Sequence, residues 1–358
     1  MNRRPTGRDV AERAGVSQAT VSLVFSGSGT GSGAAAHRVS EATRRRVLAA
    51  AAELGYAPQA AGRQLRLGRT GLLLLAVPNI LGPFFARVLA GAQTEAAQAG
   101  STGAADGGLS VVVSSAWDHA ALARAARGGQ YDGLLICSPD DSQLGGDLPD
   151  DVPVVFLDAD PALSAGHPRR RTQQLDVGAG MAAAVAHLRA LGHERLGHLR
   201  SVESAHTFRA RQAGFEAAAA GAQVVEVGVS VNGGLEAARA AARLLLAEAG
   251  DRPRAVVCDD DVVAAGVYHV AAELGLRVPE DLSVVGIDNI VAAPLFSPAL
   301  TTVDLPGERL GGAGVRLLTA LTALPAPGAA DARSGAGSAL PEPEPLPTHL
   351  VVRGSTGP

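Results

Sequence analysis

Residues 6–25 read TGRDVAERAGVSQATVSLVF, a pattern that predicts two short helices joined by a tight turn. Thr6 with Asp9 three positions later is an acidic variant of the capping box, so the first helix should begin there. Gly15 can take the left-handed backbone conformation that ends a helix, and Ser17 is a favoured cap for the second helix. Because two helices this short cannot form a domain alone, a third helix must complete their core.

The second of these helices has the polar first turn with which a helix-turn-helix reads the DNA major groove. On that geometry Ser17 and Thr20 hold phosphate groups, and the base edges face Gln18, Ala19 and Leu23. A Gln side chain can make two hydrogen bonds to adenine, and Ala or Leu can touch a thymine methyl group. Spacing alone leaves one alternative open, a helical hairpin without a DNA-binding role.

A third helix is expected after residues 26–38, SGSGTGSGAAAHR. A phosphate-binding loop needs a strand before it, whereas a helix precedes this stretch, so a flexible linker is the better interpretation. Ser40 caps the third helix and Gly55 ends it. Apolar residues recur at helical spacing and should face the shared core: Val47, Leu48, Ala51 and Leu54.

The run D-V-A-x-x-A-G-V-S-x-x-T-V-S, Asp9 to Ser22, resembles the N-terminus of the lactose-repressor (LacI/GalR) family of bacterial transcription regulators. VSEATRRRVLAAAAELGYAP, residues 39–58, continues the resemblance, which recurs to the end of the chain. It implies an N-terminal all-α helix-turn-helix domain, residues 1–57. We add Thr6, Ser22 and Arg63 to the residues expected to contact DNA.

PQAAGRQLRLGR, residues 58–69, is too short to be helical alone, and Gly62 in its middle costs roughly 1 kcal/mol, so it should be disordered until something binds it. The resemblance implies a hinge helix that folds on DNA and pairs with its copy in a second subunit. It places Leu65 in the minor groove, where an apolar wedge bends the duplex. Gln59 and Gly62 depart from the usual Asn and Ala, so this hinge should fold less readily.

The net charge of −4 is unevenly distributed, because the N-terminal part of the chain (the head, residues 1–70) is basic and the remainder is acidic. Residues 1–70 hold eleven Arg and four acidic residues, a balance of +7, which leaves −11 for the rest. This suits a DNA partner for the head, with Arg44, Arg45 and Arg46 near the DNA backbone or, alternatively, on a solvated face. No apolar run reaches the roughly 18 residues of a membrane span, and no secretory signal is visible, so we expect a cytoplasmic protein.

From residue 70 to 358, short apolar runs alternate with Ala-rich helical stretches. LLLLAVP, LSVVVSSA, YDGLLICS and PVVFLD form one set, and RLGHLRS, AVVCDD and LSVVGID form a second. Such runs predict parallel strands that helices bury on both faces, here in two lobes around a cleft. The resemblance implies the two-lobed α/β fold of periplasmic sugar-binding proteins, with chain crossings near residues 170, 302 and 325. Cys137 and Cys258 should be buried free thiols.

Carboxylates at the ends of these strands should face the cleft and accept hydrogen bonds from sugar hydroxyl groups. Four residues match positions that commonly contact the effector in the family: Asp158, Arg211, Asp260 and Asp288. Phe84 and Phe85 match its P-F-F motif and could cover a ring face. Each residue has a structural alternative, since a Phe pair is often core and a strand-end Asp often caps a helix, which we expect of Asp261. Near residue 230, where the family often has an aromatic residue, the chain offers only Val229 or Val231.

No enzymatic motif is recognised. HERLGH, residues 193–198, resembles the zinc-protease motif, but its two His are five positions apart and cannot share a helix face. No nucleophile elbow or Walker loop occurs, so we expect no catalytic residues, cofactor or metal. We therefore expect a transcriptional repressor that binds a pseudo-palindromic operator as a homodimer or tetramer, away from membranes, and senses a sugar or related metabolite. The alternatives are a sugar-binding protein without a regulatory role and, more weakly, an enzyme.

Overall fold

The computed structural model describes residues 5–25, 39–56, 69–101, 109–115, 119–139, 148–248, 250, 252–324 and 340–358. The chain divides into two compact units, Met1–Arg69 and Thr70–Pro358, each with its own internal contacts. The predicted Arg63 and Leu65 contacts of the hinge, and Gly62, lie outside the described residues. Within this part of the chain, no helix combines the length and apolar character needed to cross a membrane.

The first unit contains helices α1 (Gly7–Ala14), α2 (Gln18–Phe25) and α3 (Glu41–Leu54). The capping box at α1 is formed as predicted, since Asp9 accepts from the Thr6 N–H at 2.7 Å and the Thr6 side chain accepts from the Asp9 N–H at 3.4 Å. Gly15 ends α1 with φ 64°, in the left-handed region. The fold of this unit is therefore set by local signals at helix ends.

Three helices share one small apolar core that includes Val10, Val21 and Val47. Phe25 and Tyr56 close it with an edge-to-face contact, their ring centroids 5.7 Å apart. The expectation that Leu48 belongs to this core is wrong, because Leu48 is 42% exposed. Its place is taken by Ala50, which lies three positions after Val47 and therefore on the same face of α3.

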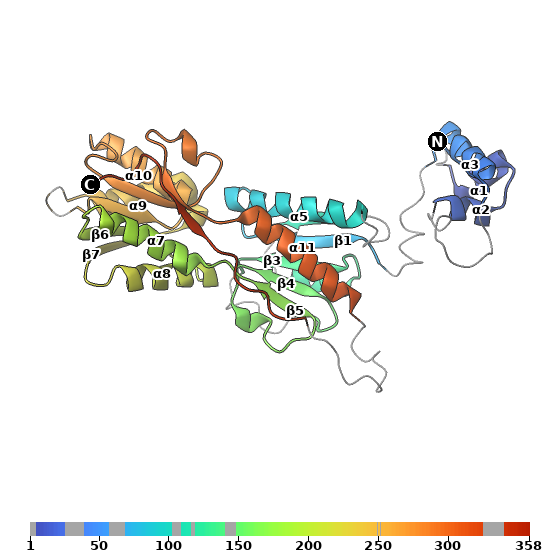
Figure 1. Cartoon of the computed structure of the whole chain (residues 1–358), viewed down its shortest axis with the longest axis horizontal. Coiled ribbons are helices and arrows are strands. Elements are labelled where there is room, and N and C mark those ends of the chain that lie inside the picture. Colours follow the sequence, from blue (N-terminus) through green and yellow to red (C-terminus); the bar gives the residue numbers. More distant parts are fainter. Residues whose placement is uncertain are drawn as a thin grey trace. The chain divides into compact units, whose positions relative to one another are not determined.

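The second unit has two lobes, each with a sheet between helices (Figure 1). The sheet of the first lobe is entirely parallel, in the order β2-β1-β3-β4-β5. Helices α5 and α11 cover one face and α6 the other. The elements of this lobe are β1 (Leu72–Ala76), α5 (Pro83–Ser101), β2 (Ser110–Ser114), α6 (His119–Arg127), β3 (Gly133–Cys137), β4 (Val154–Leu157), the 3₁₀ turn η1 (Pro161–Leu163), β5 (Arg170–Gln173) and α11 (Gly307–Ala323).

The second lobe has the strand order β11-β10-β9-β8-β6-β7. Its strands are parallel except β11, which pairs antiparallel with β10 at the edge. Helices α7 and α8 cover one face, and α9 and α10 the other. The elements are α7 (Val177–Ala190), β6 (Arg195–Ser201), α8 (His206–Ala218), β7 (Gln223–Val229), η2 (Val231–Gly233), α9 (Gly234–Leu246), β8 (Ala255–Cys258), α10 (Asp261–Glu273), β9 (Ser283–Asp288), η3 (Ala293–Leu295), β10 (Thr301–Asp304) and β11 (His349–Val351).

In the described part of the chain, three segments connect the lobes. The first follows β5 and the second follows β10, in line with the crossings expected near 170 and 302. The third lies later than the expected position near 325, because Leu346 pairs with Leu175 and the chain enters the second sheet only at His349. Residues 325–339, outside the described part, separate the end of α11 from this return.

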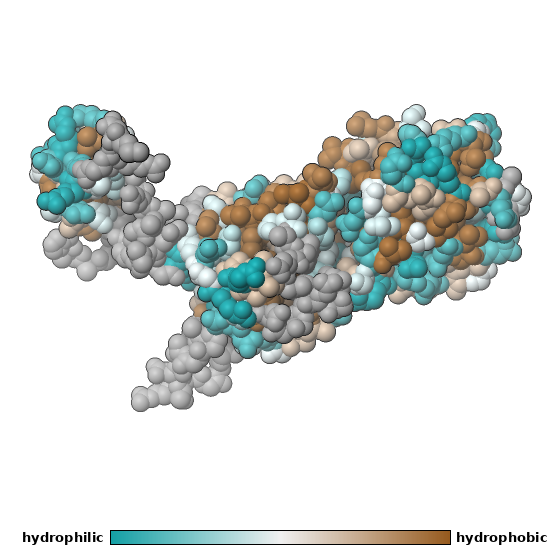
Figure 2. All heavy atoms as spheres, turned by 180° about the vertical axis from the view of Figure 1, so that it is seen from behind, coloured by the Kyte–Doolittle hydropathy of each residue, from teal (hydrophilic) through white to brown (hydrophobic). Residues whose placement is uncertain are grey.

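Both cysteines are free and buried, as predicted. Large apolar side chains also remain on the surface of the second unit, among them Leu81, Val291 and Leu295, which are 86%, 85% and 80% exposed. Figure 2 shows apolar surface on both lobes of this unit. An exposed apolar surface of this kind is a common mark of contact with another protein chain.

Candidate functional site

The exposed face of α2 carries the residues predicted to read DNA. Gln18, Ala19 and Ser22 are exposed, while Leu23 is half-buried. Because Val21 and Val24 are buried in the shared core, the opposite face of α2 is fixed against its neighbours. The helix therefore presents a short polar surface from a rigid support.

Two hydroxyl groups at the start of α2 are held by each other. The Ser17 Oγ accepts from the Thr20 N–H at 3.1 Å, which confirms Ser17 as the cap, and lies 2.9 Å from the Thr20 Oγ1. The Thr6 hydroxyl is likewise engaged, since it donates to Asp9 at 2.8 Å. These groups can still accept or donate one further hydrogen bond, as phosphate contacts require.

A cavity of about 260 Å³ lies between the two lobes of the second unit. All six residues predicted to contact a ligand line it, so residues more than 200 positions apart in sequence meet at one place. The lining residues are Pro78, Asn79, Gly82, Pro83, Phe84, Phe85, Ser138, Asp158, Glu203, Ser204, Ala205, Thr207, Phe208, Arg211, Val231, Asn232, Asp260 and Asp288. A cleft at the carboxyl ends of parallel strands is the usual ligand site of such folds.

Three polar atoms in this lining are buried without a hydrogen-bond partner: Asp158 Oδ2, Thr207 Oγ1 and Arg211 Nε. Their residues are only 2%, 2% and 4% exposed. A buried polar atom without a partner is costly, and native proteins rarely leave one. The Thr207 hydroxyl lies close enough to Asp158 to lower the pKa of that carboxyl group, so an acceptor, a hydroxyl group and the N–H of Arg211 converge on one polar space.

Arg211 extends from α8 and is fixed on three sides. One terminal nitrogen donates to the Asp259 carbonyl oxygen, and the other lies 3.7 Å from Asp288 Oδ1. The guanidinium also stands 5.1 Å from the ring centroid of Phe208. The cation is therefore held by contacts from its own helix and from the ends of β8 and β9.

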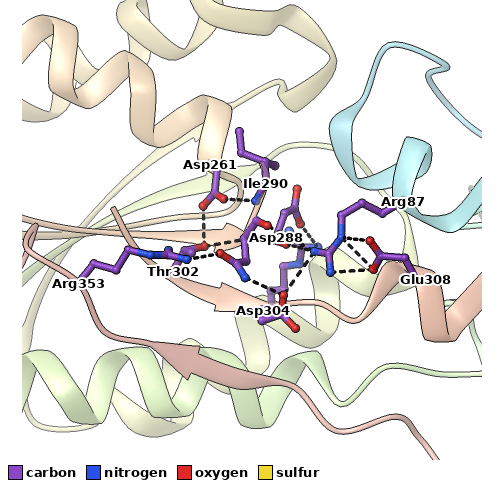
Figure 3. A network of polar contacts seen from close by, with 10 residues as sticks. Arg87, Asp261, Asp288, Ile290, Thr302, Asp304, Glu308 and Arg353 are labelled. Carbon is purple, nitrogen blue, oxygen red and sulfur yellow. Dashed lines mark hydrogen bonds and ion pairs between the residues drawn. The ribbon is translucent and has the colours of Figure 1, made fainter. Parts of the chain in front are cut away.

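Of the three Asp residues that follow β8, Asp260 and Asp261 have roles opposite to one expectation. Asp260 caps α10, because its Oδ1 accepts from the Val263 N–H at 2.6 Å. Asp261, expected to be the cap, is fully buried, and it accepts from Thr302 Oγ1 at 2.6 Å and from the Ile290 N–H at 2.8 Å (Figure 3). Asp261 thus joins the start of α10 to β10 and to the loop after β9, while Asp260 both caps the helix and lines the cavity.

The end of β9 is joined to the first lobe by Arg87 of α5 (Figure 3). Arg87 donates to the Asp288 carbonyl oxygen at 2.9 Å and lies 3.3 Å from Asp304 Oδ1. Its Nε donates to both oxygens of Glu308, at 2.9 and 3.0 Å, at the start of α11. Asp288 has φ 109°, in the left-handed region that is strained for a residue with a side chain. The backbone that bears this cavity carboxylate is therefore held from the opposite lobe.

Glu203 is a cavity residue that the sequence patterns did not identify. It accepts hydrogen bonds from Ser201, from Ser230 at 2.6 Å and from Asn232 at 3.4 Å. Burial alone would raise the pKa of Glu203, but hydrogen bonds from the two serines lower it below its usual value. Because Glu203 follows the end of β6, the same strand-end signal that indicated Asp158 would have found it. Ser138, after β3, carries this signal too.

Aromatic side chains enter the cavity from two elements. Phe84 and Phe85 at the start of α5 contact each other edge to face, with centroids 5.5 Å apart. Phe84, 6% exposed, belongs to the core and also lines the cavity, so its contact with a ligand stays a prediction. Val231 stands where an aromatic residue was sought, and Phe208 from α8 lines the same cavity.

Burial governs the charge state of the cavity carboxylates. It raises the pKa of Asp158, although Arg211 opposes the shift. Burial raises the pKa of Asp260 to about 6, and it raises the pKa of Asp288 well above its usual range. Ionised together these groups would repel one another, so a ligand that donates hydrogen bonds would favour their charged forms.

Both units of the chain match known protein families. Residues 6–59 match the bacterial regulatory proteins of the lacI family, and residues 185–356 match a periplasmic binding protein-like domain. The first match falls on the helical unit, and the second covers most of the second lobe together with α11 of the first lobe.

Whole-chain relatives show the same combination. The HTH-type transcriptional repressor PurR of Photobacterium profundum is 35% identical over 324 residues, which cover 87% of this chain and 90% of the relative. PurR of Serratia proteamaculans is 34% identical, with 86% and 87% covered. Among solved structures, the lac repressor dimer bound to operator and the anti-inducer ONPF is 28% identical with a TM-score of 0.78, covering 99% of this chain and all of that one. The complex of the regulator CelR with cellobiose, also 28% identical, has a TM-score of 0.66 and coverage of 98% and 100%.

Proposed function

Since this chain belongs to the LacI family of bacterial regulatory proteins, we propose that α2 reads the operator and that the cavity between the lobes holds the effector. The protein is a DNA-binding transcriptional repressor with a small-molecule effector. The observation that carries the effector site is the convergence of Asp158, Thr207 and Arg211 on one cavity, each with a buried polar atom lacking a partner.

For the DNA-binding unit, the exposed side chains of Gln18 and Ala19 contact base edges, together with Leu23. The hydroxyl groups of Thr6, Ser17 and Thr20 near the helix starts, and that of Ser22 farther along α2, contact phosphate oxygens. Arg63 and Leu65 of the segment that joins the units act in the minor groove, Leu65 as the wedge between base steps. A pseudo-palindromic operator follows if two copies of the chain bind together.

The effector is a sugar or a chemically related metabolite. Support comes from the mixture of carboxylate acceptors, one guanidinium and aromatic rings, because paired hydroxyl groups and a ring face use all three. Asp158 and Phe84 contribute from the first lobe, while Arg211, Asp260 and Asp288 contribute from the second. A ligand that bridges these groups would favour closure of the lobes.

We assign the active form to a homodimer or larger assembly, which the exposed apolar side chains on both lobes support. Effector binding alters the pairing of the first lobes and thereby the hinge segments, so the affinity for operator changes. A coupling free energy of about 1–3 kcal/mol, or roughly 5- to 150-fold in affinity, is ordinary for such a switch.

A gel-shift assay with the DNA upstream of the gene tests the proposal. We expect salt-sensitive, sequence-selective binding by the full-length chain, with half-sites that point to a dimer. Calorimetric screening of the same protein against sugars and related metabolites should find a ligand that changes the gel shift. A protein that binds sugar but ignores DNA would instead be a solute-binding protein, and the proposal would be wrong.

A further inference from the structure

The cavity between the lobes is strongly acidic. Among the described residues that line it, four carry carboxylates and a single one carries a cation: Asp158, Glu203, Asp260, Asp288 and Arg211. Asp158 belongs to the first lobe and the other acids to the second, so acidic side chains line the cavity on both sides. Lobe closure would bring these groups closer together.

The one cation already stands against two protein oxygen atoms. Binding of a phosphate or carboxylate by arginine usually employs the two-pronged edge of the guanidinium. In Arg211, one terminal nitrogen already donates to the Asp259 carbonyl and the other faces Asp288. Its Nε has no partner, and an anion bound to the guanidinium would lie beside the Asp288 carboxyl group.

Helix N-termini are the other common anion sites, and those of α5, α8 and α10 border the cavity. At α10 the position is filled, because the Asp260 carboxylate accepts from the Val263 N–H at 2.6 Å. At α8 no side chain caps the first turn, so its first N–H groups are not occupied by a side-chain acceptor. A hydroxyl oxygen can accept from these groups as well as an anion can, and only an anion would be opposed by Asp158, which lines the same cavity.

The Asp158 Oδ2 atom, which has no hydrogen-bond partner, also favours a ligand with donor groups over an anion, since a carboxylate oxygen accepts hydrogen bonds. We propose that the cavity selects a polyhydroxylated ligand without an anionic group, and that a protonated amine on the ligand strengthens binding. The inference rests on the proposed role of the cavity as the effector site and specifies the chemical class of effector. An ammonium group offers three donors and a positive charge to a cavity in which carboxylates outnumber cations.

The pKa of Asp260 supports the same class of ligand. Burial raises the pKa of Asp260 to about 6, so an empty cavity holds part of its carboxylate as the neutral acid near that pH. A bound cation would favour ionisation, and binding of an amine should therefore release protons. Binding of the corresponding uncharged sugar should release fewer.

Calorimetric titration of the full-length protein with matched compounds tests the proposal. The first set of compounds is glucose, glucosamine and glucose 6-phosphate. The second set is the galactose equivalents, and the third is adenosine with adenosine 5′-monophosphate. We expect the phosphorylated member of any binding set to be at least about tenfold weaker than its parent, and an amino member to be tighter. A phosphorylated compound that binds as tightly as its parent would overturn the proposal, as would no binding by any uncharged or amino member at millimolar concentration.

A variant pair isolates the contribution of charge. Asp260→Asn removes one cavity charge and keeps a side chain that can cap α10. For the parent sugar or nucleoside that binds best, this variant should reduce the ratio between the dissociation constants of the phosphorylated and parent compounds by about threefold to tenfold. Asp150→Asn removes the same charge from a side chain that is 88% exposed and lines no part of the cavity, and it should leave the ratio unchanged. Equal effects of the two variants would contradict the inference.

Gel shifts of the wild-type protein separate this inference from the proposed function. If the protein binds its operator and a phosphorylated sugar releases or tightens the complex, the ligand class is wrong while the regulatory function stands. If no DNA is bound at all, the proposed function itself fails.

Discussion

His198 is a buried imidazole with an acidic side chain at each ring nitrogen. It is 0% exposed, its Nδ1 lies 3.0 Å from Glu226 and its Nε2 lies 3.0 Å from Asp259. Its ring also stacks on Phe215, with centroids 4.1 Å apart. Burial by itself would lower the pKa of His198, but the hydrogen bonds to Asp259 and Glu226 outweigh burial and raise it. The carbonyl of Asp259 holds Arg211, so this cluster lies directly behind the cavity.

Replacing His198 by Leu should destabilise the second lobe, because it leaves the buried Asp259 without its cation. Loss of one partner of a buried pair costs about 3–5 kcal/mol. A raised pKa means that the charged histidine contributes fully below pH 6.5 and that its contribution disappears as pH rises through the raised value. Urea denaturation at pH 6 and pH 9 should therefore show the larger deficit at pH 6.

The matched control for this variant is His269→Leu, since His269 is exposed on α10. It should change the free energy of unfolding by no more than about 0.5 kcal/mol. A deficit for His198→Leu that is the same at both pH values would show that only packing on Phe215 had been lost.

Single residues show where sequence patterns fail. Strand ends predicted the cavity carboxylates Asp158, Asp260 and Asp288, because parallel strands bring their carboxyl ends to one edge. The same reasoning could not distinguish Asp260 from Asp261, since adjacent residues follow the same strand. Their roles are decided by distant partners, such as Thr302, which binds Asp261.

At the scale of elements, α5 and α11 pack unusually closely through glycine. A Cβ atom on Gly311 would lie 1.9 Å from the Val88 carbonyl oxygen, and one on Gly91 would lie 2.0 Å from that of Glu308. The backbones of the two helices are therefore in contact at these points, which fixes one against the other over the sheet of the first lobe (Figure 1).

Gly311→Ala should force α5 and α11 apart and lower the free energy of unfolding by about 1–3 kcal/mol, as overpacking does. The adjacent Gly312→Ala is the control, because its nearest atom would be the flexible Glu95 carboxylate at 3.4 Å. That change should be neutral or stabilising by up to about 1 kcal/mol, as alanine favours helix. The measurement is the melting temperature of both variants, and Gly311→Ala should melt at the lower temperature. Equal melting temperatures would contradict close packing of the two helices.

Elements with strong local signals were predictable, whereas those defined by partners were not. Thr6, Gly15 and Ser17 identified the helix ends, and continuous apolar runs identified β3, β4, β8 and β9. Strand β5 reads RRTQ and lacks such a run. Its polar residues are buried because the returning chain covers them, as when Arg171 Nε donates to the Leu340 carbonyl at 2.8 Å. That return, and the antiparallel β11, depend on contacts with no local signature.

For the molecule as a whole, the proposed DNA-reading helix and the proposed effector cavity belong to separate units of the chain. Gln18→Ala should reduce discrimination at the contacted base pair by about 1–3 kcal/mol and leave effector affinity unchanged. Asp288→Asn should weaken effector binding by about tenfold or more and leave the affinity of the empty protein for operator unchanged. Gel shifts on operator variants, with calorimetry, measure both properties. Loss of the same property in both variants would refute the division.

Arg87 is placed to connect the effector state with the first lobe. Its side chain, 18% exposed, contacts Asp304 and the Asp288 carbonyl in the second lobe and Glu308 in the first (Figure 3). Because Asp288 also lines the cavity, a ligand that shifts this loop would change the contacts of Arg87. The change in the contacts of Arg87 would then alter the packing at the starts of α5 and α11.

Arg87→Gln should therefore reduce the effect of ligand on operator affinity by about 0.5–2 kcal/mol, through the loss of contacts between lobes. The measurement is the ratio of operator dissociation constants with and without saturating effector. Arg316→Gln is the matched control, since Arg316 also pairs with a carboxylate of α5, Glu95, but lies 60% exposed and contacts no residue of the second lobe in the described structure. It should leave the ratio intact. If both variants reduce the ratio equally, the pairing of α5 with α11, rather than the contact across the lobes, transmits the signal.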